Sequence, residues 1–310
     1  MENTILGIHH ITAIAGDAKR NLDFYTRVLG LRLVKKTVNF DDPYTYHFYY
    51  GDQTGTPGTI LTFFPWANIM TGRRGTRQVT EIGYSVPEGS LAFWLERLEK
   101  NNVLYNKPAE KFGEEYVTFL DPDGLKFELT VSQKADTRTP WTTPEMSPDN
   151  ATRGFHHITI TTSAIQPTAD VLTGILDYHL ASQHVNRFRF INEAAEFASM
   201  VDIVEVPGEK PGHIAGGSVH HVAFRVKDDH VLMYYRQKVL EQGLHITEKI
   251  DRNYFYSLYF REPGGVLFEI ASDNPGFAVD EEVNSLGQAL KLPAQFEKRR
   301  AEIEQHLPLL

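Results

Sequence analysis

The sequence predicts an α+β fold made of four consecutive βαβββ modules, and three observations support this prediction. A histidine pair opens a strand-like segment three times, at Gly7–Thr12, Gly154–Thr159 and Val219–Ala223. A helical pattern follows each of these segments. Two hairpins also match position by position, Asp121–Glu128 and Glu262–Glu269, and both end in Phe-Glu. Self-similarity of this kind indicates one supersecondary unit that is repeated along the chain.

The first module shows each element of the pattern. Asp17 can cap a helix over Asp17–Gly30, and the glycine is a typical C-terminal stop. Apolar side chains recur at helical spacing between these two residues. Two aromatic strands are expected at Thr45–Tyr50 and Thr59–Phe64, and the Gly/Pro-rich segment between them predicts a turn.

The three further modules begin near Gln78, at Gly154 and at Ser218. Their helices are expected at Glu88–Asn101, Thr168–Leu180 and Asp228–Gln242. The strands that we can place in these modules are Tyr116–Leu120, Leu125–Leu129, Phe188–Phe190, Phe197–Val206, Ser257–Arg261 and Val266–Ile270.

The modules group into two similar halves. Residues 1–133 form the N-terminal half and residues 154–272 the C-terminal half, with two modules in each. The Thr- and Pro-rich segment 134–153 is expected to be the linker. Residues 273–310 form a C-terminal tail, for which we expect a helix from Pro293 to about His306 docked on the body of the protein.

Composition limits the possible partners. There are 31 basic and 40 acidic residues, a net charge of −9, and the absence of a long basic run argues against nucleic acid or an anionic membrane. No apolar stretch approaches the roughly 18 residues of a membrane span. The N-terminal residues from Met1 lack a basic region, and His9 and His10 interrupt any apolar signal segment. We therefore expect a cytoplasmic protein that binds small molecules, as a monomer or a homo-oligomer.

On these repeats the chain resembles the vicinal oxygen chelate superfamily. Further segments make it similar to the hydroquinone-cleaving type of ring-cleaving dioxygenases within that superfamily, namely Gly55–Thr59, Arg153–His156, Asp251–Glu269, Ser285–Gly287 and Leu290–Lys291. The resemblance covers nearly the whole chain. It implies that the four modules pair into two curved sheets that cradle a metal ion.

The resemblance also implies where the metal ligands lie. In the superfamily they are the second residue of the histidine pair and the glutamate of the last strand. Modules one and four then offer His10, His221 and Glu269, with Thr62 as a poor fourth ligand. The chain contains no cysteine, so histidine and carboxylate are the strong ligands available. Two His and one carboxylate with open positions are typical of non-haem Fe(II) oxygenases.

Modules two and three offer a second possible cluster. The corresponding positions hold His157, Glu81 and Glu128, and Glu205 is the expected fourth member. Three carboxylates and one imidazole would need a hard cation or compensating basic residues. We therefore prefer the first cluster and interpret the second as a decayed site whose side chains are satisfied internally.

Pairing in the fourth hairpin predicts a further site residue. If Pro263–Gly265 is the connection, Tyr259 lies directly opposite Glu269, and opposed residues project to the same face of a sheet. The phenol of Tyr259 would then reach the substrate or dioxygen. The residue opposite Glu128 in the second module is Thr118, which lacks this chemistry.

Four neighbours complete the expected site. Arg252 can neutralise a phenolate or a product carboxylate, although a surface ion pair is an equal alternative. Thr12 shares a strand face with His10. His9 and His220 would face the other way in a regular strand, and the resemblance leaves them a hydrogen-bonding or proton-transfer role if a bulge turns them. His47 could reach a cleft, but we interpret it as a core residue. We interpret most of the other histidines as surface or helix residues, namely His179, His184, His213, His230, His245 and His306.

The function that follows is an Fe(II)-dependent dioxygenase that opens a hydroquinone-type or catechol-type ring with incorporation of O₂. Two alternatives remain open at this stage. One is a glyoxalase-like isomerase or lyase that uses Zn²⁺ or Ni²⁺ with a fuller ligand set. The other is a metal-free protein that sequesters an aromatic compound, and it predicts no functional loss when His221 is replaced.

Overall fold

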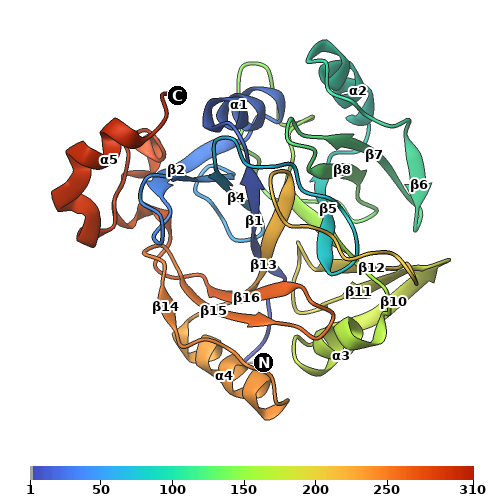
Figure 1. The fold of residues 1–310 in the computed structure, drawn as a ribbon. Helices are drawn as coiled ribbons and strands as arrows, with labels where there is room; N and C mark the ends of the chain where they lie inside the picture. Colours follow the sequence, from blue (N-terminus) through green and yellow to red (C-terminus); the bar gives the residue numbers. More distant parts are fainter. Residues whose placement is uncertain (1–2) are drawn as a thin grey trace.

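The computed structural model describes residues 3–310, so Met1 and Glu2 of the predicted first half lie outside it. The four modules have the predicted βαβββ order (Figure 1). Module one comprises β1 (Ile8–Ala15), α1 (Ala18–Asp23) continued by a π-helical turn (Phe24–Val28), β2 (Arg32–Val38), β3 (Tyr46–Gly51) and β4 (Ile60–Pro65). Module two comprises β5 (Gln78–Val86), α2 (Leu91–Lys100), β6 (Ala109–Lys111), β7 (Glu114–Leu120) and β8 (Lys126–Val131).

The second half repeats this order. Module three comprises β9 (Gly154–Thr162), α3 (Gln166–Gly174), β10 (His179–His184), β11 (Arg187–Ile191) and β12 (Met200–Glu205). Module four comprises β13 (Ser218–Val226), α4 (Asp229–Glu241), β14 (Ile250–Asp251), β15 (Tyr256–Arg261) and β16 (Leu267–Ser272). The last helix of the tail is α5 (Arg300–His306). The 3₁₀ turns before it are Phe277–Val279, Val283–Ser285 and Ala294–Arg299.

The modules pair into two eight-stranded sheets, and each sheet takes one module from either half of the sequence. Modules one and four form the order β14-β15-β16-β13-β1-β4-β3-β2, and modules three and two form β10-β11-β12-β9-β5-β8-β7-β6. At the centre of each sheet the first strands of the two modules run antiparallel, β1 against β13 and β5 against β9. This pairing places the histidine pairs of modules one and four on adjacent strands.

One predicted helix boundary is wrong. The helix expected over Thr168–Leu180 ends at Gly174, and 179–184 forms strand β10. Strand β10 is exposed along most of its length, so it lacks the apolar alternation that would have indicated a strand.

Strand alternation separates the core from the site. On β1, Ile11 and Ala13 pack into the main apolar core with residues of the helices, such as Trp94 of α2 and Leu232 of α4. The intervening side chain of Thr12 therefore points to the opposite, concave face, because successive residues of a strand face opposite sides. The concave face of this sheet carries the polar groups described below.

The C-terminal tail docks along β2, as Figure 1 shows for the red segment. The ammonium of Lys35, which is fully buried, lies 2.5 Å from carboxylate oxygens of both Asp280 and Glu281. The amide of Lys291 also donates to the carbonyl of Lys36 at 2.9 Å. The predicted docking of the tail is therefore confirmed, and it covers an edge strand of the first sheet.

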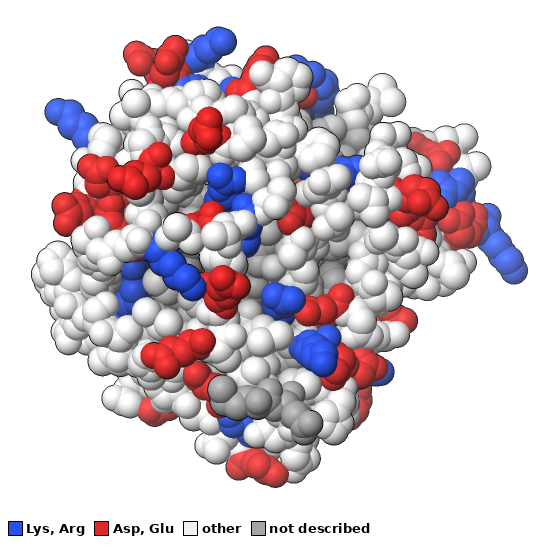
Figure 2. Space-filling model, turned by 180° about the vertical axis from the view of Figure 1, so that it is seen from behind, with Lys and Arg blue, Asp and Glu red and all other residues white. Residues whose placement is uncertain are grey.

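The surface carries charges of both signs. Figure 2 shows acidic and basic side chains interspersed over the face that is hidden in Figure 1. Within residues 3–310, none of the helices is long and apolar enough to cross a membrane.

Candidate metal centre

Both histidine pairs of the first sheet lie at β-bulges. In the pairing of β1 with β13, His9 and His220 are each the extra residue at a register shift. A bulge places two residues opposite one and changes the direction of the side chains. The rings of His9 and His220 therefore turn toward their neighbours, with Nδ1–Nδ1 distances of 2.9 Å to His10 and 2.7 Å to His221.

The structure brings together the three residues that the sequence indicated as metal ligands. Nε2 of His10 lies 3.2 Å from Oε2 of Glu269, and Nε2 of His221 lies 2.9 Å from the same oxygen. All three candidate ligand atoms are within 4.8 Å of one another. The side chains are buried, and Glu269 is fully inaccessible to solvent.

Hydrogen bonds between the paired rings favour one arrangement of protons. Burial, followed by the neighbouring His10, holds the pKa of His9 well below its usual range, so His9 is neutral. Burial and the neighbouring His221 lower the pKa of His220 to about 4. Nδ1–H of His10 can donate to His9, and Nδ1–H of His221 can donate to His220. In this arrangement the Nε2 lone pairs of His10 and His221 remain free to bind a metal. Such outer hydrogen bonds typically orient metal-ligating histidines.

The hydrogen bonding of Glu269 shows that this cluster fits a cation. Its Oε1 accepts a 2.5 Å bond from the hydroxyl of Ser257, but its buried Oε2 has no hydrogen-bond donor among the described residues. A buried ionised oxygen without a donor is costly, and a metal ion bound to the three converging atoms would satisfy it.

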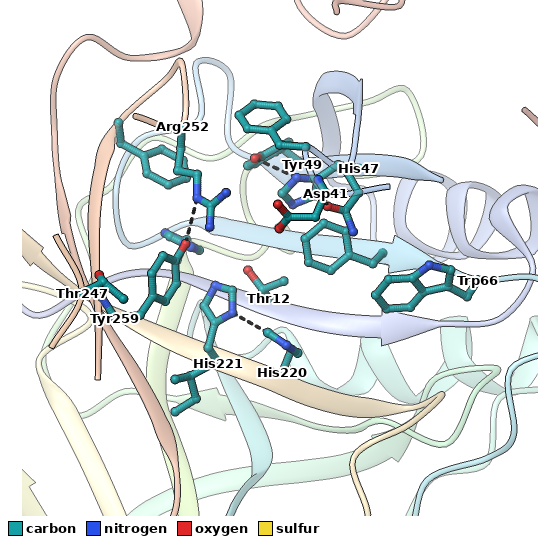
Figure 3. Close-up of a pocket in the computed structure, with 16 residues that line it drawn as sticks. Thr12, Asp41, His47, Tyr49, Trp66, His220, His221, Thr247, Arg252 and Tyr259 are labelled. Carbon is teal, nitrogen blue, oxygen red and sulfur yellow. Dashed lines mark hydrogen bonds between the residues drawn. The ribbon is translucent and has the colours of Figure 1, made fainter. Parts of the chain in front are cut away.

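A cavity of about 330 Å³ is lined by His10 and His221, two of the three candidate ligands. Figure 3 shows its lining with His221 labelled. The cavity lies within the range of typical small-molecule sites, roughly 300–1,000 Å³. Aromatic side chains form much of its wall, namely Phe40, Tyr49, Phe64, Trp66, Phe255 and Tyr259. Its polar lining is His10, Thr12, Asn39, Asp41, His47, His220, His221, Thr247 and Arg252.

The predicted register of the fourth hairpin is confirmed. Tyr259 pairs with Glu269, and its ring meets the ring of His221 edge-on with 5.5 Å between centroids. Nε of Arg252 donates to the phenol oxygen of Tyr259 at 3.2 Å, as the dashed line in Figure 3 shows. The corresponding pairing in module two, Thr118 with Glu128, is also confirmed.

Four of the five other predicted residues line the cavity, namely Thr12, His220, Arg252 and Tyr259. His9 does not line it. Its ring lies behind His10 against Phe255, with 5.2 Å between centroids, and it borders a separate cavity of about 260 Å³. His9 can therefore act on the site only through His10.

His47, which we interpreted as a core residue, lines the same cavity. The phenol of Tyr49 lies 3.0 Å from its Nδ1, and its Nε2 lies 2.9 Å from Oγ1 of Thr62. Thr62 in turn donates to the hydroxyl of Thr12 at 2.9 Å. In this chain of bonds the hydroxyl proton of Thr12 is left free to donate into the cavity. The pairing of β3 with β4, which brings His47 to Thr62, could not be placed in register from the sequence.

The second predicted cluster also assembles, with one correction. Glu81, Glu128 and His157 come within 4.8 Å of one another on the second sheet. Glu205 does not join them, because its carboxylate accepts from the amide of Ile165 at 2.8 Å instead. Asp202 takes the position expected for Glu205, since it pairs with Thr159 as Thr62 pairs with Thr12 in the first sheet.

Four βαβββ modules paired into two curved sheets, one of which presents two imidazoles and a carboxylate beside an aromatic cavity, define the vicinal oxygen chelate class of proteins. The pattern of the Glyoxalase/Bleomycin resistance protein/Dioxygenase superfamily matches residues 7–129 and 154–270, and the chain belongs to this superfamily.

Relatives with similar sequences span the full chain. MhqO of Bacillus subtilis (strain 168), a candidate ring-cleaving dioxygenase, is 45% identical over 99% of this chain and 97% of its own length. The chlorohydroquinone/hydroquinone 1,2-dioxygenase of Sphingobium indicum is 36% identical over 96% of this chain and 94% of its own.

Solved structures agree with the fold. A candidate dioxygenase from Bacillus subtilis superposes with a TM-score of 0.95 at 44% identity, covering 99% of this chain and 98% of the other. Glyoxalase I from Zea mays superposes with a TM-score of 0.64 at 16% identity, covering 86% of this chain and 92% of its own, which supports the fold alone.

Proposed function

We propose that this protein is an Fe(II)-dependent ring-cleaving dioxygenase that acts on hydroquinone-type or catechol-type phenols with uptake of O₂. One observation carries the proposal: three convergent ligand atoms of His10, His221 and Glu269 have an open side that faces an aromatic cavity. The name of the Sphingobium indicum relative supports hydroquinones as the substrate class.

The ligand set suits this chemistry because it leaves coordination positions open. Nε2 of His10, Nε2 of His221 and Oε2 of Glu269 would hold the metal. A bound Fe(II) would supply adjacent positions for a phenol oxygen and for O₂, together with a path for electrons between them. In the overall reaction, a C–C bond beside a hydroxylated ring carbon breaks, and both oxygen atoms enter the opened product.

Residues around the cavity position the phenol. With Nδ1 of His220 accepting from His221, the remaining ring N–H of His220 is a donor into the cavity. The free hydroxyl proton of Thr12 is a second donor, held in place by its bond from Thr62. Both groups can donate a hydrogen bond to an oxygen of the substrate. Both are neutral, so neither repels a bound phenolate.

Arg252 and Tyr259, which line the same cavity, act as one unit. Arg252 supplies a positive charge, and its 3.2 Å bond fixes the phenol oxygen of Tyr259 as an acceptor. The phenol proton is then free to donate toward an oxygen atom near the ligands. Burial and the nearby Glu269 raise the pKa of Tyr259, so the phenol keeps its proton at neutral pH.

The ligand count favours this function over a glyoxalase-like isomerase. The fourth ligand position is occupied by Thr62, whose hydroxyl is already bonded to His47 and Thr12. The site therefore offers three protein ligands, fewer than the fuller set that we expect for such an isomerase.

Metal analysis tests the assignment. After anaerobic loading with Fe(II) and desalting, the wild-type protein should retain one iron per chain, whereas the variant with Ala at positions 10, 221 and 269 should retain none. His157→Ala is the matched control in the second sheet and should keep its iron. Retention of iron by the triple variant, or its loss from His157→Ala, would show that the metal lies elsewhere.

A further inference from the structure

The second sheet contains a counterpart of the metal centre, residue for residue. His157 corresponds to His10 as the second histidine of its pair, and Glu128 corresponds to Glu269 as the glutamate of the closing hairpin. Glu81 takes the place of His221, because it pairs with Thr159 across the central strands as His221 pairs with Thr12. The two sheets therefore offer the same three positions, with different charges.

A lysine ammonium occupies the centre of this second cluster. Nζ of Lys111 lies 2.6 Å from Oε2 of Glu128, 3.4 Å from Nε2 of His157 and 3.6 Å from Oε1 of Glu81. Lys111 is 7% exposed, and Glu128 is fully buried. The ammonium thus contacts all three of the side chains that would hold a metal ion.

Lys111 stands at the position of Arg252 in the repeat. Lys111 pairs with Glu114 at the start of its hairpin, and the amide of Arg252 likewise donates to the carbonyl of Phe255 three residues on. Phe112, the next residue after Lys111, is in the left-handed region (φ 51°), as is the residue after Arg252 (φ 66°). The two cations therefore enter their clusters from the same direction.

The residue on the following strand, β15 or β7, determines which group each cation binds. Arg252 is held away from the candidate ligands by its bond to the phenol of Tyr259. The residue at the corresponding position in the second sheet is Thr118, whose hydroxyl is engaged by the side-chain amide of Asn106 at 2.7 Å. Without a phenol to bind, Lys111 extends to the carboxylate of Glu128.

Lys111 belongs to a network of carboxyl groups and cationic side chains. Ion pairs of 2.5–3.1 Å link the other three cations to three carboxylates. The network joins Glu81, Glu114, Glu128 and Asp202 to Lys111, Lys126, Arg187 and Arg189. Four carboxyl groups and four cationic side chains therefore meet beside the cluster. Loss of one partner from a buried ion pair leaves an uncompensated charge, which is strongly destabilising.

We propose that the Lys111 ammonium fills a second, metal-type site, and that a neutral residue at position 111 would turn the cluster of Glu81, Glu128 and His157 into a binding site for a divalent cation. The expectation of one metal ion per natural chain rests on the proposed function of the first sheet. Because carboxylates predominate, a hard ion such as Mn²⁺ is the suitable probe.

The test is the number of Mn²⁺ ions bound per chain by Lys111→Met, measured by spin counting and calorimetry on the full-length protein after removal of metals by a chelator. Wild type should bind one, Lys111→Met should bind two, and Lys111→Met with His157→Ala should return to one. Lys126→Met is the matched control, because this half-exposed lysine contacts Glu81 from outside and its loss should leave the count at one.

The first site can be removed without losing this test. Lys111→Met combined with His221→Ala should still bind one Mn²⁺, so failure of the proposed function and failure of this proposal are distinguishable. A folded Lys111→Met variant that binds no more Mn²⁺ per chain than wild type would overturn the proposal. A variant that folds only with Mn²⁺ present would support it, since the metal then replaces the ammonium.

A converse variant decides the question if Lys111→Met folds under no condition. Arg252→Lys with Tyr259→Thr gives the first sheet the lysine and threonine of the second. The ammonium should then compete for Glu269, and Mn²⁺ affinity should fall at least tenfold below that of Tyr259→Thr alone. Equal affinities of the two proteins would contradict the proposal.

Discussion

The hydrogen bond from His10 to His9 offers a sharp test of how the metal centre is organised. We consider His9→Leu, which places an apolar side chain against Phe255 and removes the ring nitrogen 2.9 Å from Nδ1 of His10. His10 would then have a buried Nδ1–H without an acceptor, and the ring would favour the tautomer that protonates Nε2. That tautomer cannot bind a metal through Nε2.

The expected loss is a 10–100-fold weaker metal affinity, or about 1.4–2.7 kcal/mol, which is the usual effect of removing such an outer partner. The assay is an anaerobic competition titration of the metal-free protein against a chelating dye. His156→Leu is the matched control, because it breaks the same 2.9 Å ring-to-ring bond in the second sheet. Equal dissociation constants for both variants and wild type would refute the orienting role of His9.

Three further predictions concern single side chains. Tyr259→Phe should keep its iron and fold but lower turnover by ~10²–10⁴-fold, the usual contribution of such a group; unchanged turnover at saturating O₂ would mean that the phenol only packs. His47→Leu should break the bond chain that orients Thr12 and lower kcat/KM by roughly 2–10-fold, with iron content unchanged, and a loss of iron would contradict this role. Burial opposes ionisation of Glu114, but the imidazole and guanidinium beside it outweigh burial and lower its pKa to about 2 from an ordinary 4.5. The ionised Glu114 therefore stabilises the fold above about pH 4.5, and this stabilisation is lost as the pH falls toward 2. The urea midpoints of Glu114→Gln and wild type should converge over that range. A difference between the midpoints that stays constant would contradict this prediction.

Much of the fold could be predicted because the repeat carries its own register. The hairpin of module four fixes the pairing of Tyr259 with Glu269 through a short connection, and the structure confirms it. The four edge strands β2, β6, β10 and β14 were not placed from the sequence. Most side chains of β6, β10 and β14 are exposed, so these strands carry no apolar alternation to detect. In β2 the basic residues Arg32, Lys35 and Lys36 interrupt the apolar pattern, although most of the strand is buried.

The misses at the site have equally local causes. The orientation of His9 and His220 depends on bulges, which insert one residue without leaving a mark in the alternation of side chains. The parallel pairing of β12 with β9 determines which residue takes the fourth position of the second cluster. That residue is Asp202, three residues before the Glu205 that we expected. Long-range register of this kind cannot be derived from one strand alone.

Incorporation of oxygen into a ring-opened product tests the central claim most directly. Iron-loaded protein should be mixed with hydroquinone under ¹⁸O₂, with O₂ uptake followed by an electrode and the product analysed by mass spectrometry. We expect one O₂ consumed per ring, two ¹⁸O atoms found in the product, and no uptake with His221→Ala. Turnover without O₂ uptake, or full activity of the His221→Ala variant, would contradict the account.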